Sequence, residues 1–96
     1  MRVELRDAAV AELNEAEERY RSIRVGLGAR FVHEFDATLQ RILLSPKGYA
    51  QVDGDTRHAR MHTFPHAVYF RIVGEVIVVL AVFHPRRNPS DRSDRR

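Results

Sequence analysis

Residues 57–87 read RHARMHTFPHAVYFRIVGEVIVVLAVFHPRR, and this stretch decides the fold. Polar and apolar side chains roughly alternate up to Val73 and a β-branched run follows Gly74, a pattern that favours strands over helices. Gly74 at the first central position suits a two-residue type II′ hairpin turn, because that position has a positive φ. Pro65 lacks a backbone N–H and belongs at a corner between two strands. The stretch therefore predicts a three-stranded antiparallel meander.

The run VIVVLAVF at residues 76–83 is apolar at every position, which is typical of a strand covered on both faces. A helical hairpin can cover only one face of a sheet. We therefore expect the second face to bind a partner, either an amphipathic helix or an extended peptide. The alternative is a cover made by long loops of the same chain. The expected partner contacts are Val76, Val78, Leu80 and Val82, together with Arg57, Arg86 and Arg87.

The N-terminal half predicts one strand and two helices. Arg2-Val3-Glu4-Leu5 alternates as a short strand does, and Asp7 is a good N-cap for the helix that follows. Apolar side chains then recur at helical spacing in two stripes, first at Leu13, Ala16, Tyr20, Ile23 and Leu27, then at Phe31, Phe35, Leu39, Ile42 and Leu43.

Two breaks in the pattern set the ends of these helices. Gly26-Leu27-Gly28 is short enough to join antiparallel helices, and Pro46 disfavours helical geometry at Ser45. Residues 47–56 read as a polar connection. The predicted fold class is α+β in the order β-α-α-β-β-β, with the N-terminal strand beside residues 76–83 and both helices on one face of the sheet.

Size and composition narrow the class of protein. The 96 residues predict one domain, and 44% hydrophobic with 30% charged residues fits a soluble globular protein. The chain has no cysteine, which excludes disulfides and cysteine-ligated metal sites. The longest apolar run is about half of the roughly 20 residues that a membrane helix needs, and the N-terminus lacks the apolar segment of a signal peptide. We expect a cytoplasmic protein that does not bind membranes.

The basic excess lies at the C-terminus. Residues 1–83 carry equal numbers of basic and acidic side chains, whereas residues 84–96 carry five arginines against Asp91 and Asp94. Such a segment can meet phosphates or an acidic protein surface, and the alternative is a solvated, disordered terminus. We predict one domain over residues 1–89 and a basic, flexible tail over residues 90–96.

Candidate catalytic residues surround the predicted meander. RNA cleavage without a metal needs a base, an acid and cations that stabilise the phosphorane charge. The side chains that could supply them are His84, Arg57, Arg60, Arg86 and Arg87, with His62 in addition. His84 is the best acid or base, because imidazole titrates near neutrality. Arg57 and Arg60 have opposite parity and are expected on opposite faces of a strand. The alternative for the His84 to Arg87 segment is a strand cap followed by surface charge.

The histidines at positions 58, 62 and 66 do not predict a metal site. Residues four apart in a strand are separated by about 13 Å, too far to share an ion. Asp53-Gly54-Asp55 resembles part of a calcium loop but lacks the remaining ligands, and a plain turn is the simpler interpretation. We expect no metal, no other cofactor and no small-molecule substrate.

With these residues placed, the chain resembles the ParE/RelE superfamily of bacterial toxins, the toxic halves of type II toxin–antitoxin modules. The resemblance covers about Val3 to Pro89. It rests on segments that occur in a shared order and spacing: the Tyr20 helix, the junction from Gly26 to Phe31, Leu43 to Pro46, Arg57 seven residues before Phe64-Pro65, Val68-Tyr69, and Leu80 to His84 followed by Arg86-Arg87 and Asn88-Pro89.

The resemblance implies a small sheet with a helical hairpin and a cognate antitoxin that folds along the toxin surface in a hetero-oligomer. The Phe64-Pro65 corner and the His84 to Arg87 segment are more similar to the ParE branch, which is associated with inhibition of DNA gyrase. RelE-like members are associated with ribosome-dependent mRNA cleavage and resemble one another in a site rich in lysine and arginine. This chain has a single lysine, Lys47.

Three functions remain as hypotheses. The first is a ParE-like, non-enzymatic toxin that binds a large target such as DNA gyrase and is neutralised by an antitoxin. The second is a ribosome-dependent mRNA endonuclease with His84 and the arginines in its site. The third is an inactive family member that acts only in a repressor complex with its antitoxin and DNA.

Overall fold

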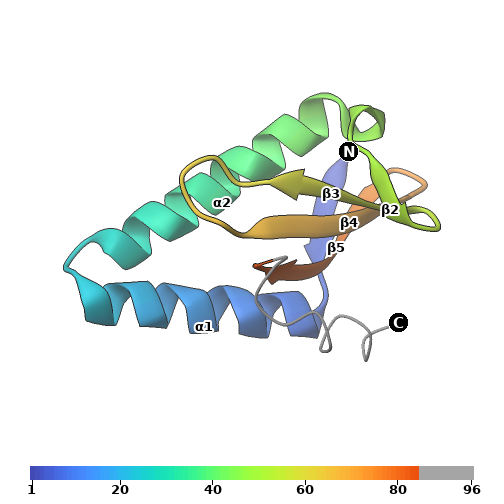
Figure 1. The fold of residues 1–96 in the computed structure, drawn as a ribbon. Helices are drawn as coiled ribbons and strands as arrows, with labels where there is room; N and C mark the ends of the chain where they lie inside the picture. The colour runs from blue at the N-terminus through green and yellow to red at the C-terminus, as the bar shows by residue number, and fades with distance from the viewer. Residues whose placement is uncertain (85–96) are drawn as a thin grey trace.

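The computed structural model describes residues 1–84 and confirms the α+β class (Figure 1). Two helices precede a run of strands, as the sequence predicts. The elements in order are β1 (Arg2–Leu5), α1 (Asp7–Ile23), α2 (Leu27–Leu44), a 3₁₀ turn η1 (Pro46–Gly48), β2 (Gln51–Asp53), β3 (Thr56–Arg60), β4 (Ala67–Val73) and β5 (Val76–Phe83). The expectations for Arg86, Arg87 and residues 90–96 lie outside the described residues.

The sheet has five strands in the order β1-β5-β4-β3-β2. Strands β3, β4 and β5 form the expected antiparallel meander, with Pro65 in the corner and Gly74 at a φ of 58° in the hairpin turn. Strand β1 pairs in parallel with β5, so the most apolar strand is interior. Strand β2 was missed, because its three exposed residues show no apolar alternation. Pairing with β3 holds these residues in a strand, although their own sequence does not favour one.

Helix α1 begins one residue away from the expected cap. Its N-cap is Arg6, and Asp7 is the first helical residue. The physical reason is the adjoining strand, because the Arg6 N–H donates to the Val79 carbonyl at 2.9 Å and holds Arg6 in an extended conformation. The Asp7 carboxylate therefore lies in the first turn, where it complements the helix dipole.

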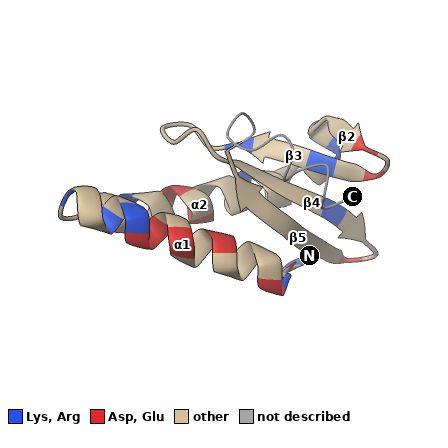
Figure 2. Cartoon of the chain, turned by 60° about the horizontal axis from the view of Figure 1, so that its bottom comes forward, with Lys and Arg blue, Asp and Glu red and all other residues tan. Residues whose placement is uncertain are grey.

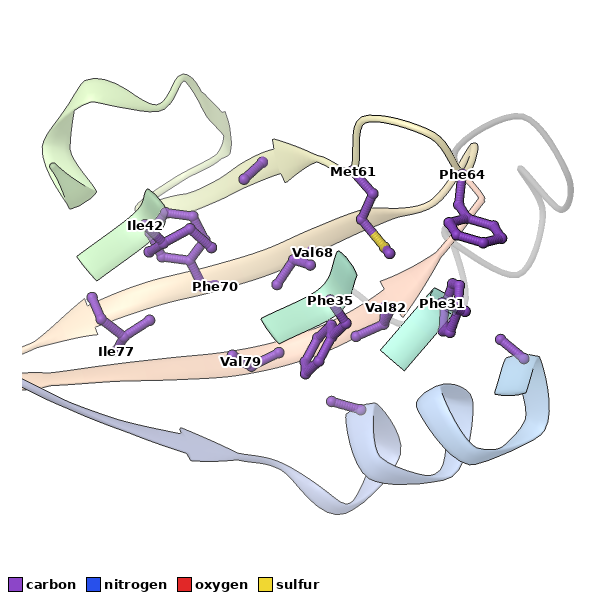
Figure 3. Close-up of a cluster of buried hydrophobic side chains, with 13 residues drawn as sticks. Phe31, Phe35, Ile42, Met61, Phe64, Val68, Phe70, Ile77, Val79 and Val82 are labelled. Atoms are coloured by element: carbon purple, nitrogen blue, oxygen red, sulfur yellow. The ribbon is translucent and has the colours of Figure 1, made fainter. Parts of the chain in front are cut away.

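The main core lies between the helices and one face of the sheet (Figure 3). Four rings from four segments meet at one end of it, namely Tyr20 of α1, Phe31 of α2, Phe64 of the β3–β4 loop and His66 beside β4. The fully buried residues farther along include Ile42, Phe70, Ile77 and Val79. Each element therefore depends on residues distant in the sequence for its hydrophobic contacts.

A β-bulge changes which side chains of β5 point at the helices. Tyr69 lies opposite Ala81, but Phe70 lies opposite Val79, so Leu80 is an extra residue in β5. Val82 consequently packs in the helix-side core with 1% of its surface exposed. Val82, which was expected to contact a partner together with Val76 and Val78, therefore faces the helices, because one extra residue exchanges the faces of the strand.

Glu12 of α1 completes the hydrogen bonding beside this bulge. Strand β1 ends at Leu5, opposite Val79, so β5 has no neighbouring strand on that side beyond Val79. The Val82 N–H donates instead to Glu12 Oε1 at 2.8 Å. One side chain of α1 therefore satisfies a backbone group that would otherwise be a buried, unpaired donor.

The second face of the sheet is partly covered by its own side chains. Ala67, Tyr69 and Ala81 are buried there and Phe83 packs against them. The Tyr69 and Phe83 rings stack with their centroids 4.5 Å apart, and two rings can shield small alanine side chains beside them. The apolar composition of β5 therefore does not by itself require a second molecule as a cover.

Candidate functional site

The candidate site is the face of the sheet turned away from the helices, which we call the outer face. The strand register places Arg60, Ala67 and Phe83 in one row across it, and His58, Tyr69 and Ala81 in the next. Arg71 of β4 lies opposite Val78 in a further row. The outer face thus combines arginines with a stacked aromatic pair.

Arg57 does not belong to the outer face. It pairs with Phe70, a residue of the helix-side core, and its guanidinium Nη1 donates to the carbonyls of Tyr49 at 2.7 Å and Lys47 at 3.2 Å. The prediction that Arg57 and Arg60 leave opposite faces is therefore correct. Arg57 holds the η1 turn against β3, which is a structural role that removes it from any site shared with Arg60.

Arg60 and His84 lie at the same end of the sheet. Arg60 is exposed and lies in the same row as Phe83, the residue that precedes His84 in the chain. The His84 ring lies 6.4 Å from the ring of His66, measured between centroids. Two imidazoles therefore lie beside each other at this corner, and His66 was not singled out as a site residue by sequence reasoning.

Arg71 was also missed, although its signal was visible. It has the same parity as Tyr69 in β4, which places it on the outer face. Its Nε atom is buried without a hydrogen-bond partner in the part of the chain that the structure describes. Four residues separate Arg71 from Ala67, the neighbour of Arg60, so the two arginines flank Tyr69 about 13 Å apart along the strands.

Two kinds of feature are absent from residues 1–84. No group of three or more histidine, aspartate or glutamate side chains is placed to hold a metal ion. None of the helices described is long and apolar enough to cross a membrane. The chemistry of the described outer face is therefore that of arginine, imidazole and aromatic groups.

Glu34 fixes the loop that leads into this corner. Its Oε1 accepts a hydrogen bond from the Thr63 N–H and a second one, at 3.3 Å, from the Phe64 N–H. Partial burial by itself raises the pKa of Glu34, but these hydrogen bonds and the nearby His62 outweigh burial and hold the pKa below its ordinary value. The carboxylate thus ties α2 to the β3–β4 loop.

Replacing Glu34 with glutamine is expected to lower the free energy of unfolding at pH 7 by about 1 kcal/mol. A lowered folded-state pKa stabilises the protein above the ordinary glutamate value of about 4.3, and this contribution is lost as the pH falls through the folded value. Urea unfolding of both proteins should therefore give a difference at pH 7 that shrinks towards pH 3. Asp36→Asn, on an exposed side chain of the same helix, is the control. An equal difference at both pH values would contradict this role.

Comparison with known proteins identifies the family. The family model of the ParE toxin of the type II toxin–antitoxin system, parDE, matches residues 3–89. This chain belongs to the ParE toxin family. Among curated protein sequences, none matches it.

Two solved structures share the fold of this ParE-family chain. One is from the chromosomal ParDE toxin–antitoxin system of P. aeruginosa, with a TM-score of 0.74 and 17% identity, over 88% of this chain and 95% of that one. The other is from the intact E. coli RelBE toxin–antitoxin complex, with a TM-score of 0.61 and 16% identity, over 88% of this chain and 96% of that one. The predicted resemblance to the ParE/RelE superfamily, and to its ParE branch, is confirmed.

Proposed function

We propose that this ParE-family chain is a toxin that arrests growth by binding a macromolecular target in the cytoplasm, DNA gyrase, without cutting RNA. The placement of Arg57 supports the proposal that the chain does not cut RNA. Its guanidinium is held by two carbonyls on the helix side of the sheet, so it cannot stabilise charge at a site that contains Arg60 and His84. Among the described residues, the expected acid, base and cations are therefore not gathered at one site.

We further propose that a cognate antitoxin neutralises the toxin by binding over the sheet. Val76 and Leu80 keep partly exposed side chains, whereas Val78 between them in β5 is buried. Arg60 and Arg71 could pair with acidic side chains of such a partner on the same face. Arg57 donates from its Nη1 atom to carbonyls of its own chain and is left out of this surface. Arg86 and Arg87 are included from the sequence alone.

The alternative activity, ribosome-dependent mRNA cleavage, has one observation in its favour. His84 and His66 lie together at the end of the sheet that also holds Arg60. Paired imidazoles can share the work of base and acid near neutral pH. The third hypothesis, an inactive member in a repressor complex, predicts no growth arrest.

Induced expression in bacteria tests the proposal, with and without the neighbouring gene for a short DNA-binding protein. We expect growth arrest that the neighbouring gene relieves, accompanied by DNA breaks and intact mRNA. The double variant Arg60→Ala with His84→Ala should arrest growth as the unmodified chain does, because neither side chain is assigned to chemistry. His33→Ala, on the exposed face of α2, is the matched control.

Three results would reject the proposal in different ways. mRNA cut at fixed codon positions, and lost in the double variant, would establish the nuclease alternative. Growth that continues normally on induction of folded protein would favour the inactive member. Arrest that no upstream or downstream gene relieves would remove the antitoxin from the proposal while leaving the toxin in place.

A further inference from the structure

The turn between α1 and α2 forms a projecting tip at the end of the molecule opposite the sheet (Figure 1). This hairpin tip, residues 19–30, contains four arginines and no acidic residue, namely Arg19, Arg21, Arg24 and Arg30. Figure 2 shows its basic residues beside the acidic middle of α1. Among the described residues, the tip is therefore the segment with the largest excess of positive charge.

Two of these arginines have a structural explanation. Arg19 pairs with Glu15 at 3.7 Å, and Arg21 pairs with Glu17 at 3.3 Å, both at a spacing of four residues on the helix. Their place in the last turns of α1 also complements the helix dipole. Neither arginine requires a partner molecule.

Arg24 and Arg30 have no such explanation. Both are exposed, and neither forms an ion pair or a side-chain hydrogen bond with the described residues. Arg30 lies near the start of α2, where the helix dipole disfavours a cation. Two cations therefore stand free on either side of the turn.

The same tip exposes apolar side chains between these cations. Val25 has 96% of its surface exposed and Ile23 has 65%, and Val25 is the most exposed of the large hydrophobic residues described. Contact with an apolar surface would remove both side chains from water. The tip thus offers two apolar groups flanked by two cations.

The conformation of the tip is fixed before any partner binds. Gly26 has a φ of 86°, and the Leu27 N–H donates to the Arg24 carbonyl at 3.1 Å. Gly28 lets the helices approach closely, because a Cβ there would lie 2.7 Å from the Glu17 carbonyl oxygen. A rigid surface loses less entropy on binding than a flexible loop.

We propose that the hairpin tip is a docking surface for a protein segment in which carboxylates alternate with apolar side chains. Nucleic acid would neutralise Arg24 and Arg30 but offer no apolar partner to Ile23 and Val25, because the phosphate backbone is recognised through charge and hydrogen bonds. A lipid surface is disfavoured because the tip exposes two aliphatic side chains and no aromatic anchor, Tyr20 being packed against Phe31 and Phe64. The proposal does not depend on the choice between gyrase and ribosome.

Methyl NMR on the full chain tests this surface with three probes: a synthetic peptide of alternating glutamate and leucine residues, a DNA duplex, and vesicles that contain phosphatidylglycerol. We expect the peptide to shift the methyl signals of Ile23 and Val25, while Ile42 and Ile77 in the core stay unchanged. Arg24→Gln with Arg30→Gln, and separately Ile23→Ser with Val25→Ser, should each weaken peptide binding roughly fivefold.

The control variants show whether peptide binding depends on the tip itself or only on the total charge and exposed apolar surface of the chain. Arg2→Gln with Arg6→Gln removes the same charge at exposed sites elsewhere, and Leu44→Ser removes an exposed apolar residue from the end of α2. Both should bind the peptide as the unmodified chain does, and circular dichroism should show all variants folded. The proposal is overturned if the peptide leaves Ile23 and Val25 unshifted, if tip and control variants bind alike, or if duplex or vesicles shift these methyl signals and the peptide does not.

Discussion

Replacing Phe31 with alanine is expected to lower the free energy of unfolding by about 3–5 kcal/mol. Phe31 is completely buried, and its ring centre lies 5.3 Å from that of Tyr20, 5.2 Å from that of Phe64 and 4.9 Å from that of His66. Removing the ring leaves a cavity where four segments of the chain meet. The loss includes ring–ring attraction in addition to the apolar area.

Thermal and urea unfolding would measure this change. For a domain of this size each 1 kcal/mol corresponds to roughly 4–8 °C in Tm, so the variant should melt well over 10 °C below the unmodified chain. Leu44→Ala, at an apolar residue with 85% of its surface exposed, should change stability by less than about 0.5 kcal/mol. A Phe31→Ala loss below about 1 kcal/mol would mean that the four-ring cluster does not hold this corner together.

The second large effect is expected at the close approach of the two helices. Replacing Gly28 with valine should lower the free energy of unfolding by about 2–3 kcal/mol, the upper part of the range for overpacking. The new Cβ would lie 2.7 Å from the Glu17 carbonyl oxygen and 3.1 Å from the Arg21 Cβ. The carbonyl belongs to the backbone of α1, so it can move only if the helices separate.

Gly48→Val provides the matched comparison for this variant. The nearest atom to a Cβ at Gly48 is the Ser45 hydroxyl oxygen at 3.0 Å, and a serine side chain can rotate away. We therefore expect a smaller loss at Gly48, measured by the same urea unfolding. Equal losses at the two glycines would show that valine acts through the backbone alone and that the helices tolerate separation.

Both effects bear on function because the helical hairpin connects two surfaces. Tyr20 and Phe31, at the end of the hairpin nearest the turn, support the corner that holds His66 and His84. The same end carries the exposed residues of the hairpin tip, whose shape depends on Gly26 and on the helix contact at Gly28. Variants that disturb either contact should weaken binding in proportion to lost structure, whereas substitutions at exposed residues should leave the fold intact.

Much of the fold could be predicted because the responsible signals are local. Gly74 and Gly26 permit the positive φ that these turns need, and Pro65 restricts its own φ, so each signal belongs to the residue itself. The two apolar stripes locate the helices for the same reason, since periodicity is a property of one segment. Strand β2 escaped detection because nothing in its own three residues favours a strand.

The candidate site was predicted less completely. Parity placed Arg57 and Arg60 on opposite faces, but it could not say that Arg57 faces the helix side and bonds to Tyr49. His66 and His84 are distant in the sequence and become neighbours only in the folded chain. Arg71 shares the parity of Tyr69, but parity alone does not show that its Nε atom is buried in the folded chain.

The sequence by itself determined the order of the elements, the hairpin turns and the superfamily, because these follow from residue type and spacing along the chain. Only the tertiary structure decided which side chains of β5 face outwards. That choice depends on the single extra residue at Leu80 and on Glu12, which accepts a hydrogen bond from Val82 across 70 residues of sequence. A bulge leaves no mark on an unbroken apolar run, so its position is fixed by hydrogen bonds to distant groups and not by the run itself.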